Sequence, residues 1–204
     1  VVVIDLQDFS IPVAISTPSI SANDLRDISS LQYQDLLNDP TRPLFNRAFM
    51  GLYPPASTIK PLLTIFALNN EYTNWDETIF DDGFFRFEEE ERIFNAWREG
   101  GHGLTNLEKA LVESSNPFFM NLSIRYEKDL FVEFLKSSSF GSKLCEDCYP
   151  HQFSPLIDDD WKYKNFGKEL YKGDFINLGV GQGYMLTTPL HLSLIHISEP
   201  TRLQ

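Results

Sequence analysis

The stretch that decides how this chain folds is Tyr53-Pro54-Pro55-Ala56-Ser57-Thr58-Ile59-Lys60-Pro61, which is followed by the apolar run Leu62–Leu68. A run that is apolar nearly all round is typical of a helix buried inside a domain. The two prolines before Ser57 favour an extended approach, and Pro61 fits the first helical turn, where its missing N–H costs little. The sequence therefore predicts a core helix that begins beside Ser57.

Ser57 and Lys60 lie one helical turn apart, so the lysine amine can reach the serine hydroxyl. A serine hydroxyl becomes a good nucleophile when a neighbouring base takes its proton, and a lysine whose pKa is lowered by burial can be that base. Free N–H groups at the helix start can stabilise an oxyanion. We interpret Ser57 as a nucleophile, although a Ser-x-x-Lys pair also arises by chance, and taken alone Ser57 reads as a helix N-cap.

The composition indicates an acidic globular chain about the size of one ordinary domain. Of the 204 residues, 42% are hydrophobic, which is enough for a sizeable core. With 29 acidic and 17 basic residues, the formal net charge is −12, which argues against nucleic acid or an anionic membrane surface as a partner. No run of about 18 apolar residues marks a membrane span. The start at Val1–Asp5 is strand-like and lacks methionine, so we expect that upstream sequence is missing.

The two cysteines, Cys145 and Cys148, are spaced Cys-x-x-Cys, with His151 three residues beyond the second. Two thiols and one imidazole form an incomplete zinc set, and no βαβ pattern surrounds them as it would a thioredoxin-type motif. We favour a local disulfide or two free thiols in a loop over a metal or redox role.

Hydrophobic patterns outline further elements. Val1–Asp5 and Ile11–Ser16 read as a hairpin of two core strands. Residues 24–38 indicate a partly helical surface segment, residues 129–136 one or two amphipathic helical turns, and residues 142–172 a loop.

Three other polar features are interpreted as structural. The carboxylates Glu88–Glu91 are typical of a solvated face. His102 has glycines on both sides, which favours a loop histidine with a structural hydrogen bond over a general base. The glycine-rich residues 177–184 lack the lysine of a P-loop and the spacing of a dinucleotide fingerprint, so they predict a tight turn before a helix.

Two helices are predicted around Ser114. The segment Thr105–Glu108 matches a capping box, which predicts a short helix that ends near Glu113. Asn116-Pro117 predicts that a second helix starts there, with Asn116 as its cap. Ser114 and Asn116 then lie on a turn between packed helices, where polar side chains can face a cleft. On local grounds alone, the simpler interpretation is that Ser114 ends one helix and Asn116 starts the next.

Several ordered motifs together resemble one family. They are Leu36–Pro40 with Pro43-Leu44, Asn46–Ala48 leading to Gly51–Pro61, Gly101–Gly103, Ser114–Asn116 with Phe118-Phe119, and Gly173-Asp174 through Asn177, Gly181–Gly183 and Thr188–Leu190. From about Val1 to His191 the chain resembles the transpeptidase domain of class B penicillin-binding proteins, nearest to the elongation-type penicillin-binding protein 2. The resemblance implies an α+β fold of the penicillin-binding and β-lactamase type, an antiparallel sheet between helical layers, truncated here at the C-terminus.

The resemblance also implies a peptidoglycan D,D-transpeptidase without a cofactor. Ser57 would attack the carbonyl between two D-alanines of a stem peptide and form an acyl-enzyme. Lys60 would take the serine proton, Ser114 would relay it to the leaving amine, and Asn116 would hold the lysine and the substrate amide. An amine from a neighbouring stem peptide would accept the acyl group, and β-lactams would acylate Ser57 because they resemble the same dipeptide.

For the parent protein, the resemblance implies a place at the periplasmic face of the bacterial inner membrane, with an N-terminal helix as anchor. It implies a membrane glycosyltransferase and cell-shape proteins as partners during cell elongation, and no nucleic acid.

Three departures from the family pattern are visible. Ala56 stands where the family commonly has glycine. Some members hold a metal near the Gly-His-Gly segment with an aspartate before the tryptophan and a cysteine after the motif serine. Those places are Ala96 and Ser115 here, so we predict no metal. The family's Lys-Thr/Ser-Gly strand, which helps to form the oxyanion hole, has no match in the chain.

Residues 192–204 resemble the translated read-through of a sequencing adapter instead. We therefore expect a partial transpeptidase domain over residues 1–191 and a non-native tail over residues 192–204. His196 is then not catalytic, and we expect the fragment itself to be inactive or nearly so.

Two alternatives stay open. A D,D-carboxypeptidase or β-lactamase-like hydrolase would use water in place of the amine acceptor, and it would need a carboxylate placed to activate that water. A non-catalytic penicillin-recognition or scaffold domain would bind its partners without forming an acyl-enzyme.

Overall fold

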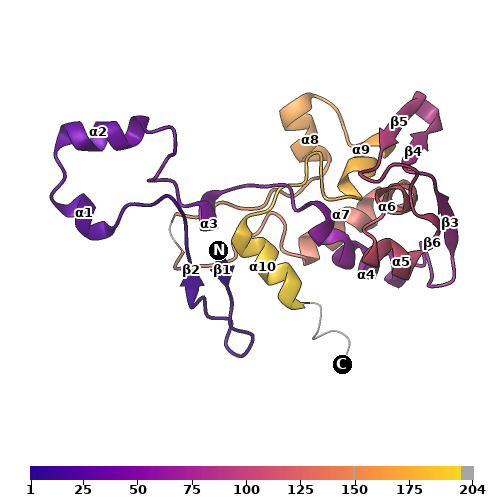
Figure 1. Ribbon diagram of the computed structural model, residues 1–204, viewed down its shortest axis with the longest axis horizontal. Coiled ribbons are helices and arrows are strands. Elements are labelled where there is room, and N and C mark those ends of the chain that lie inside the picture. Colours follow the sequence, from indigo (N-terminus) through magenta and orange to yellow (C-terminus); the bar gives the residue numbers. More distant parts are fainter. Residues whose placement is uncertain (149, 199–204) are drawn as a thin grey trace. The chain divides into compact units, whose positions relative to one another are not determined.

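The computed structural model describes residues 1–148 and 150–198 (Figure 1). The chain divides into two compact units. The first unit is formed by residues 1–53, 142–154 and those from 187 onward, and the second by residues 54–141 and 155–186.

Among its described residues, the first unit contains a short antiparallel strand pair and four helices. Its elements are β1 (Val2–Val3), β2 (Val13–Ala14), α1 (Ala22–Arg26), α2 (Ser30–Asn38), α3 (Arg47–Met50) and α10 (Pro189–Ser198). The predicted hairpin is present, with Val2 opposite Ala14. Its strands are short and Val3 is 45% exposed, so the prediction of two core strands is wrong. Neither α1 nor α2 has a buried residue, which confirms the predicted surface segment.

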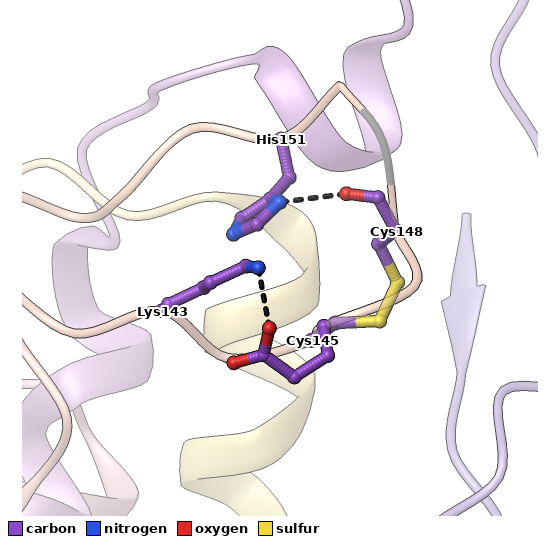
Figure 2. The surroundings of a disulfide bond; sticks show 5 residues. Lys143, Cys145, Cys148 and His151 are labelled. Atoms are coloured by element: carbon purple, nitrogen blue, oxygen red, sulfur yellow. Dashed lines mark hydrogen bonds and ion pairs between the residues drawn. A yellow bond between two sulfur atoms is a disulfide. The ribbon is translucent and has the colours of Figure 1, made fainter.

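The cysteine loop of the first unit is closed by a disulfide. Figure 2 shows Cys145 bonded to Cys148, with His151 Nδ1 at 2.6 Å from the carbonyl oxygen of Cys148. Nearby, Lys143 forms an ion pair with Glu146. The local disulfide was one of the two arrangements that the spacing favoured. Both sulfurs are bonded to each other, so neither is available as a thiolate metal ligand.

The second unit holds most of the helices together with two small sheets. Its elements are η1 (Ala56–Ile59), α4 (Lys60–Asn69), β3 (Thr78–Asp81), β4 (Phe84–Phe87), η2 (Glu88–Glu90), β5 (Arg92–Asn95), β6 (Gly103–Asn106), α5 (Leu107–Val112), α6 (Asn116–Ser123), α7 (Lys128–Ser137), α8 (Asp159–Phe166) and α9 (Lys172–Leu178). Strand β3 pairs with β6, and β4 with β5, both antiparallel. The fold is α+β as predicted, and in the part of the chain that the structure describes its strands form three two-stranded sheets.

Helix α4 is a core element of the second unit, as its apolar run predicted. Leu63 and Ala67 are fully buried, and the ring of Phe66 lies 4.9 Å from that of Tyr126 and 5.5 Å from that of Phe131. Burying each such apolar side chain stabilises the fold by about 1.5–3 kcal/mol. Figure 1 shows α4 gathered with α5, α6 and α7 in this unit. Lys60, the first residue of α4, is therefore held in place by a packed helix.

Three local predictions need correction. Asn106, not Thr105, caps α5, because its side-chain oxygen accepts from the backbone N–H of Lys109. Ser115, not Asn116, caps α6. The predicted loop over residues 142–172 contains α8, which Asp158 caps. A run of aspartates is typical of a loop. Here Asp158 caps the helix, and Asp159 and Asp160 lie in its first turn, where negative charge is stabilising.

Two other local predictions are confirmed. Helix α7 lies where the amphipathic pattern placed it, and Glu88–Glu91 is exposed. Across the described ranges, no helix is both long and apolar enough to reach through a membrane. Helix α10 continues past residue 191 to Ser198, and the last six residues of the expected tail lie outside the described part. The boundary between residues 191 and 192 stays a prediction.

Candidate active site

Ser57 lies in the short turn η1, directly before α4. Ala56, at the start of this turn, has a φ of 50°, in the left-handed region that favours glycine. Its N–H donates to the carbonyl of Gly181 at 2.8 Å, and a Cβ added to Gly181 would lie 2.2 Å from the Ala56 carbonyl oxygen. The Ser57 turn is therefore fixed by a backbone contact that requires glycine at position 181. The glycine-rich segment is the tight turn that its sequence predicted.

Ser114 lies in the turn between α5 and α6, with a φ of 55°. The next residue, Ser115, caps α6 by accepting a hydrogen bond from the N–H of Phe118 at 3.3 Å. Because Ser115 provides the cap, Asn116 occupies the first helical position, and its side-chain oxygen is available for another partner.

These two turns bring the four predicted site residues together. The Ser114 hydroxyl lies 2.7 Å from that of Ser57 and 3.1 Å from Lys60 Nζ. Lys60 Nζ also donates to the Ser114 carbonyl oxygen at 2.9 Å and to Asn116 Oδ1 at 2.8 Å. Within the described ranges, no hydrogen bond joins Lys60 directly to Ser57, and Ser114 stands between them. Ser57 itself is exposed, so a substrate can reach it.

Lys60 is buried, and its amine lies 5.1 Å from the centre of the Phe119 ring. Burial lowers the pKa of Lys60 to about 8, and the negative charge of Asp81 opposes this shift without cancelling it. The hydrogen-bond acceptors around the amine are a hydroxyl, a carbonyl and an amide, all of them neutral. A substantial fraction of this amine is therefore unprotonated at mildly alkaline pH.

The arrangement can move a proton from Ser57 to Lys60. A charged lysine uses its three N–H bonds on the three oxygens around it. Once it loses a proton, its lone pair can accept from the Ser114 hydroxyl, which in turn can accept from Ser57. Reversal of the two hydrogen bonds then makes Ser57 the group that gives up its proton.

His102 is held by a carboxylate that the sequence did not point to. Its Nδ1 lies 2.7 Å from Asp81 Oδ2, which confirms the structural hydrogen bond expected for this histidine. The same carboxylate oxygen accepts from the Ser115 hydroxyl at 2.6 Å. Sequence reasoning missed Asp81, because 34 residues separate it from Ser115 and no local pattern signals the contact.

The residues near His102 do not fit the metal site held by some relatives of the resembled family. Ala96 has no donor atom, and the Ser115 hydroxyl is engaged with Asp81. No cluster of three or more His, Cys, Asp or Glu side chains suited to a metal occurs among residues 1–148 and 150–198. The absence of a metal at this place stays a prediction from the residue types.

Comparison with known families and proteins gives a consistent result. The family described as penicillin binding protein transpeptidase domain matches residues 1–195. The peptidoglycan D,D-transpeptidase MrdA of Haemophilus influenzae is 37% identical over 194 residues, which are 95% of this chain and 30% of that protein. The chain thus spans less than a third of the length of that curated relative.

Solved structures show the same likeness. A complex between penicillin-binding protein 2 and MreC from Helicobacter pylori matches with a TM-score of 0.86 and 31% identity, covering 94% of this chain and 36% of that one. Penicillin-binding protein 2 of Pseudomonas aeruginosa matches with a TM-score of 0.83 and 31% identity, covering 90% of this chain and 42% of that one.

Proposed function

This chain belongs to the penicillin-binding protein transpeptidase domain family, and from that premise we propose that the complete protein carrying it is a peptidoglycan D,D-transpeptidase. The observation that carries the proposal is the hydrogen-bonded series Ser57, Ser114 and Lys60, which ends on a buried lysine with a lowered pKa. The name of the Haemophilus influenzae relative, a peptidoglycan D,D-transpeptidase, supports it.

The proposed reaction begins at Ser57. Its oxygen attacks the carbonyl carbon between two D-alanines of a stem peptide, while its proton passes to Ser114 and the Ser114 proton passes to Lys60. Collapse of the tetrahedral intermediate breaks the peptide bond, and a proton returns through Ser114 to the departing amine of D-alanine. The product is an ester between Ser57 and the shortened peptide.

The second half of the reaction resolves this ester. An amine from a neighbouring stem peptide attacks the ester carbonyl and gives its proton to Lys60 through Ser114, and Ser57 leaves with a proton. Asn116, which already accepts a hydrogen bond from Lys60, would orient both the lysine and the substrate amide.

Hydrolysis in place of cross-linking would need a carboxylate that activates water. Asp81 is the carboxylate whose charge reaches Lys60, but it is buried. Its Oδ1 accepts from the N–H of Gly83, and its Oδ2 lies within hydrogen-bond distance of His102 and Ser115. Asp81 is therefore not free to activate water, which argues against Asp81 as the base of a carboxypeptidase or β-lactamase activity.

The test is labelling of the complete protein with a fluorescent penicillin, followed by mass spectrometry of the labelled peptide. We expect one acyl group on Ser57 and none in Ser57→Ala. Labelling that survives Ser57→Ala, or a folded wild-type protein that takes no label, would reject the proposal. The second result would favour the non-catalytic recognition or scaffold alternative.

For the 204-residue chain by itself we propose little or no activity. The Lys-Thr/Ser-Gly triplet of the family does not occur in its sequence, and loss of oxyanion-hole donors reduces turnover on the order of a hundredfold or more. Labelling of the isolated chain at the rate of the complete protein would contradict this.

Partners and location are also proposed from the relatives. The Helicobacter pylori complex pairs penicillin-binding protein 2 with MreC, which supports a cell-shape protein as a partner here. We further propose a membrane glycosyltransferase partner, and a place at the periplasmic face of the inner membrane with an N-terminal anchoring helix. Crosslinking and fractionation of cells that express the tagged complete protein would test these points.

A further inference from the structure

Behind the Ser114 turn lies a buried polar group that the proposed reaction does not use. We call Asp81, His102 and Ser115 the Asp81 cluster. The side chains of Asp81 and His102 are 0% exposed, and Ser115 is buried as well. The three residues come from separate elements, since Asp81 ends β3, His102 precedes β6 and Ser115 caps α6. The cluster therefore joins the β3–β6 sheet to the start of α6.

The sheet side of the cluster is held rigidly. Asp81 Oδ1 accepts from the N–H of Gly83 at 2.9 Å, and the Asp81 carbonyl accepts from the N–H of His102 at 3.1 Å. Gly101 has a φ of 66°, and a Cβ added to it would lie 2.2 Å from the Asp81 carbonyl oxygen. Lys109 Nζ donates to the carbonyl of His102. The carboxylate thus has a fixed position from which to hold Ser115.

The helix side of the cluster lies between two proposed catalytic residues. Ser115 donates to Asp81 and caps α6, while its chain neighbours Ser114 and Asn116 both contact Lys60. Ser114 has a φ of 55°, in the left-handed region that is unfavourable for a residue other than glycine. Such a conformation persists only where its surroundings hold it. The hydrogen bond from Ser115 to Asp81 fixes the residue that directly follows Ser114, so it can hold Ser114 in this conformation.

A second contact runs from the cluster to the same turn. The Trp97 ring lies edge-on to His102 with ring centres 5.6 Å apart, and its Nε1 donates to the Ser114 carbonyl oxygen at 3.4 Å. That carbonyl oxygen also accepts from Lys60. His102 therefore supports the turn through Trp97 as well as through Asp81.

We infer that the Asp81 cluster is a positioning unit for the acyl-transfer reaction, which holds Ser114 and Asn116 at hydrogen-bonding distance from Ser57 and Lys60. The inference rests on the proposed function. Asp81 has a second, electrostatic effect, because its charge favours the protonated form of Lys60. The other groups that contact the lysine, Ser114, Asn116 and the ring of Phe119, are uncharged.

The experiment measures acylation of the complete protein by a penicillin in stopped flow, which separates the binding constant from the rate constant of acylation. The variants are Ser115→Ala and Asp81→Asn. Ser123→Ala is the matched control, because Ser123 is a buried serine of the same helix whose hydroxyl donates to the Met120 carbonyl. Ser115→Thr keeps the hydroxyl and serves as the conservative rescue.

We expect the acylation rate constant to fall by about tenfold to a hundredfold in Ser115→Ala and Asp81→Asn, since misplacement by about 1 Å has effects of this size. The penicillin binding constant should stay within about threefold of wild type, while Ser123→Ala and Ser115→Thr should react like wild type. In Asp81→Asn the midpoint of the pH–rate profile should also move to lower pH, because the charge that favours protonated Lys60 is gone. A loss of rate caused only by a smaller folded fraction would not move this midpoint.

Acylation rate constants in both cluster variants within twofold of Ser123→Ala would overturn the inference. Should Ser115→Ala fail to fold, Asp81→Asn, which leaves the α6 cap in place, decides by the same rate and midpoint criteria. A wild-type protein that is not acylated overturns the proposed function and this inference with it. Normal acylation of the wild type and of the cluster variants overturns this inference alone.

Discussion

Two buried lysines of the second unit, Lys60 and Lys162, differ in what surrounds their amines. They are 2% and 3% exposed, and each amine lies over an aromatic ring. Lys60 meets neutral oxygens, and burial lowers its pKa to about 8. Lys162 forms an ion pair with Asp174 at 2.7 Å. Burial alone would lower the pKa of Lys162, but hydrogen bonds to Asp174 and Tyr184 outweigh it and raise that pKa.

The difference shows how one residue type can serve two purposes in the same unit. A buried amine without a carboxylate partner becomes a base near neutral pH, whereas a buried amine with one becomes a structural ion pair. Both lysines lie on helices, and the sequence around Lys162 does not show that its amine meets Asp174, which lies 12 residues away on another helix.

The largest effect is expected from Lys60→Met in the complete protein. Loss of the base should reduce penicillin acylation by about a thousandfold, within the range of general-base contributions. The fold should be retained, because no buried carboxylate loses its partner. Stopped-flow acylation together with thermal melting checks both points. A folded variant whose acylation rate constant lies within tenfold of the wild-type value would show that Lys60 is not the base.

Lys162→Met should show the opposite pattern. It leaves the buried Asp174 carboxylate without its counter-charge, so the free energy of unfolding should fall by about 3–5 kcal/mol. Folded molecules should still be acylated normally. Urea denaturation measures the loss, and the double variant Lys162→Met/Asp174→Asn should recover much of it. A loss below about 1 kcal/mol in the single variant would show that the Lys162–Asp174 ion pair does not stabilise the fold as proposed.

The pH dependence of acylation sharpens the Lys60 side of the comparison. The neutral amine is the reactive form, so the rate should rise with pH and level off above the pKa of about 8. Between pH 7 and pH 9 we expect an increase of about tenfold. Acylation kinetics in a series of buffers at constant ionic strength would show it. A flat profile over this range would count against Lys60 as the base.

The smallest effect concerns the backbone near each lysine. Ala56, before α4, has a φ of 50°, while Gly167, which ends α8, has a φ of 67°. Ala56→Gly should raise the free energy of unfolding by up to about 1 kcal/mol, because glycine accepts this conformation without a Cβ clash. The matched change Gly167→Ala should lower it by a similar amount. The free energies of unfolding are measured in urea. If Ala56→Gly and Gly167→Ala changed them in the same direction, the backbone conformation would not be the cause.

Much of the candidate site could be read from the sequence because its residues carry local signals. Ser57 and Lys60 are one turn apart at the start of an apolar helix, and Ser114 and Asn116 lie between two helix signals. The spacing predicted direct contact between the Lys60 amine and the Ser57 hydroxyl, but the structure places the Ser114 hydroxyl between them. That detail depends on how two turns meet across the fold, which spacing along the chain does not specify.

The cap of α6 and the helix α8 could not be predicted from the sequence, because each involves contacts with residues distant in the chain. Ser114, Ser115 and Asn116 can each cap a helix, and the structure uses Ser115, whose hydroxyl also donates to Asp81. Helix α8 has a low apolar content, so its pattern resembles a loop, and its stability depends on packing and on the buried Lys162–Asp174 pair. In both cases the structure contains a contact with a residue distant in the sequence that no local pattern shows.

The most direct test of the central claim is an NMR titration of the complete protein labelled with ¹³C at the lysine side chains, with Lys60→Met and Lys162→Met used to assign the two resonances. The account predicts that Lys60 titrates near pH 8, while Lys162 stays charged above the ordinary lysine pKa of 10.5. Titration of Lys60 at or above 10.5 would contradict the claim that this buried amine is the base for Ser57.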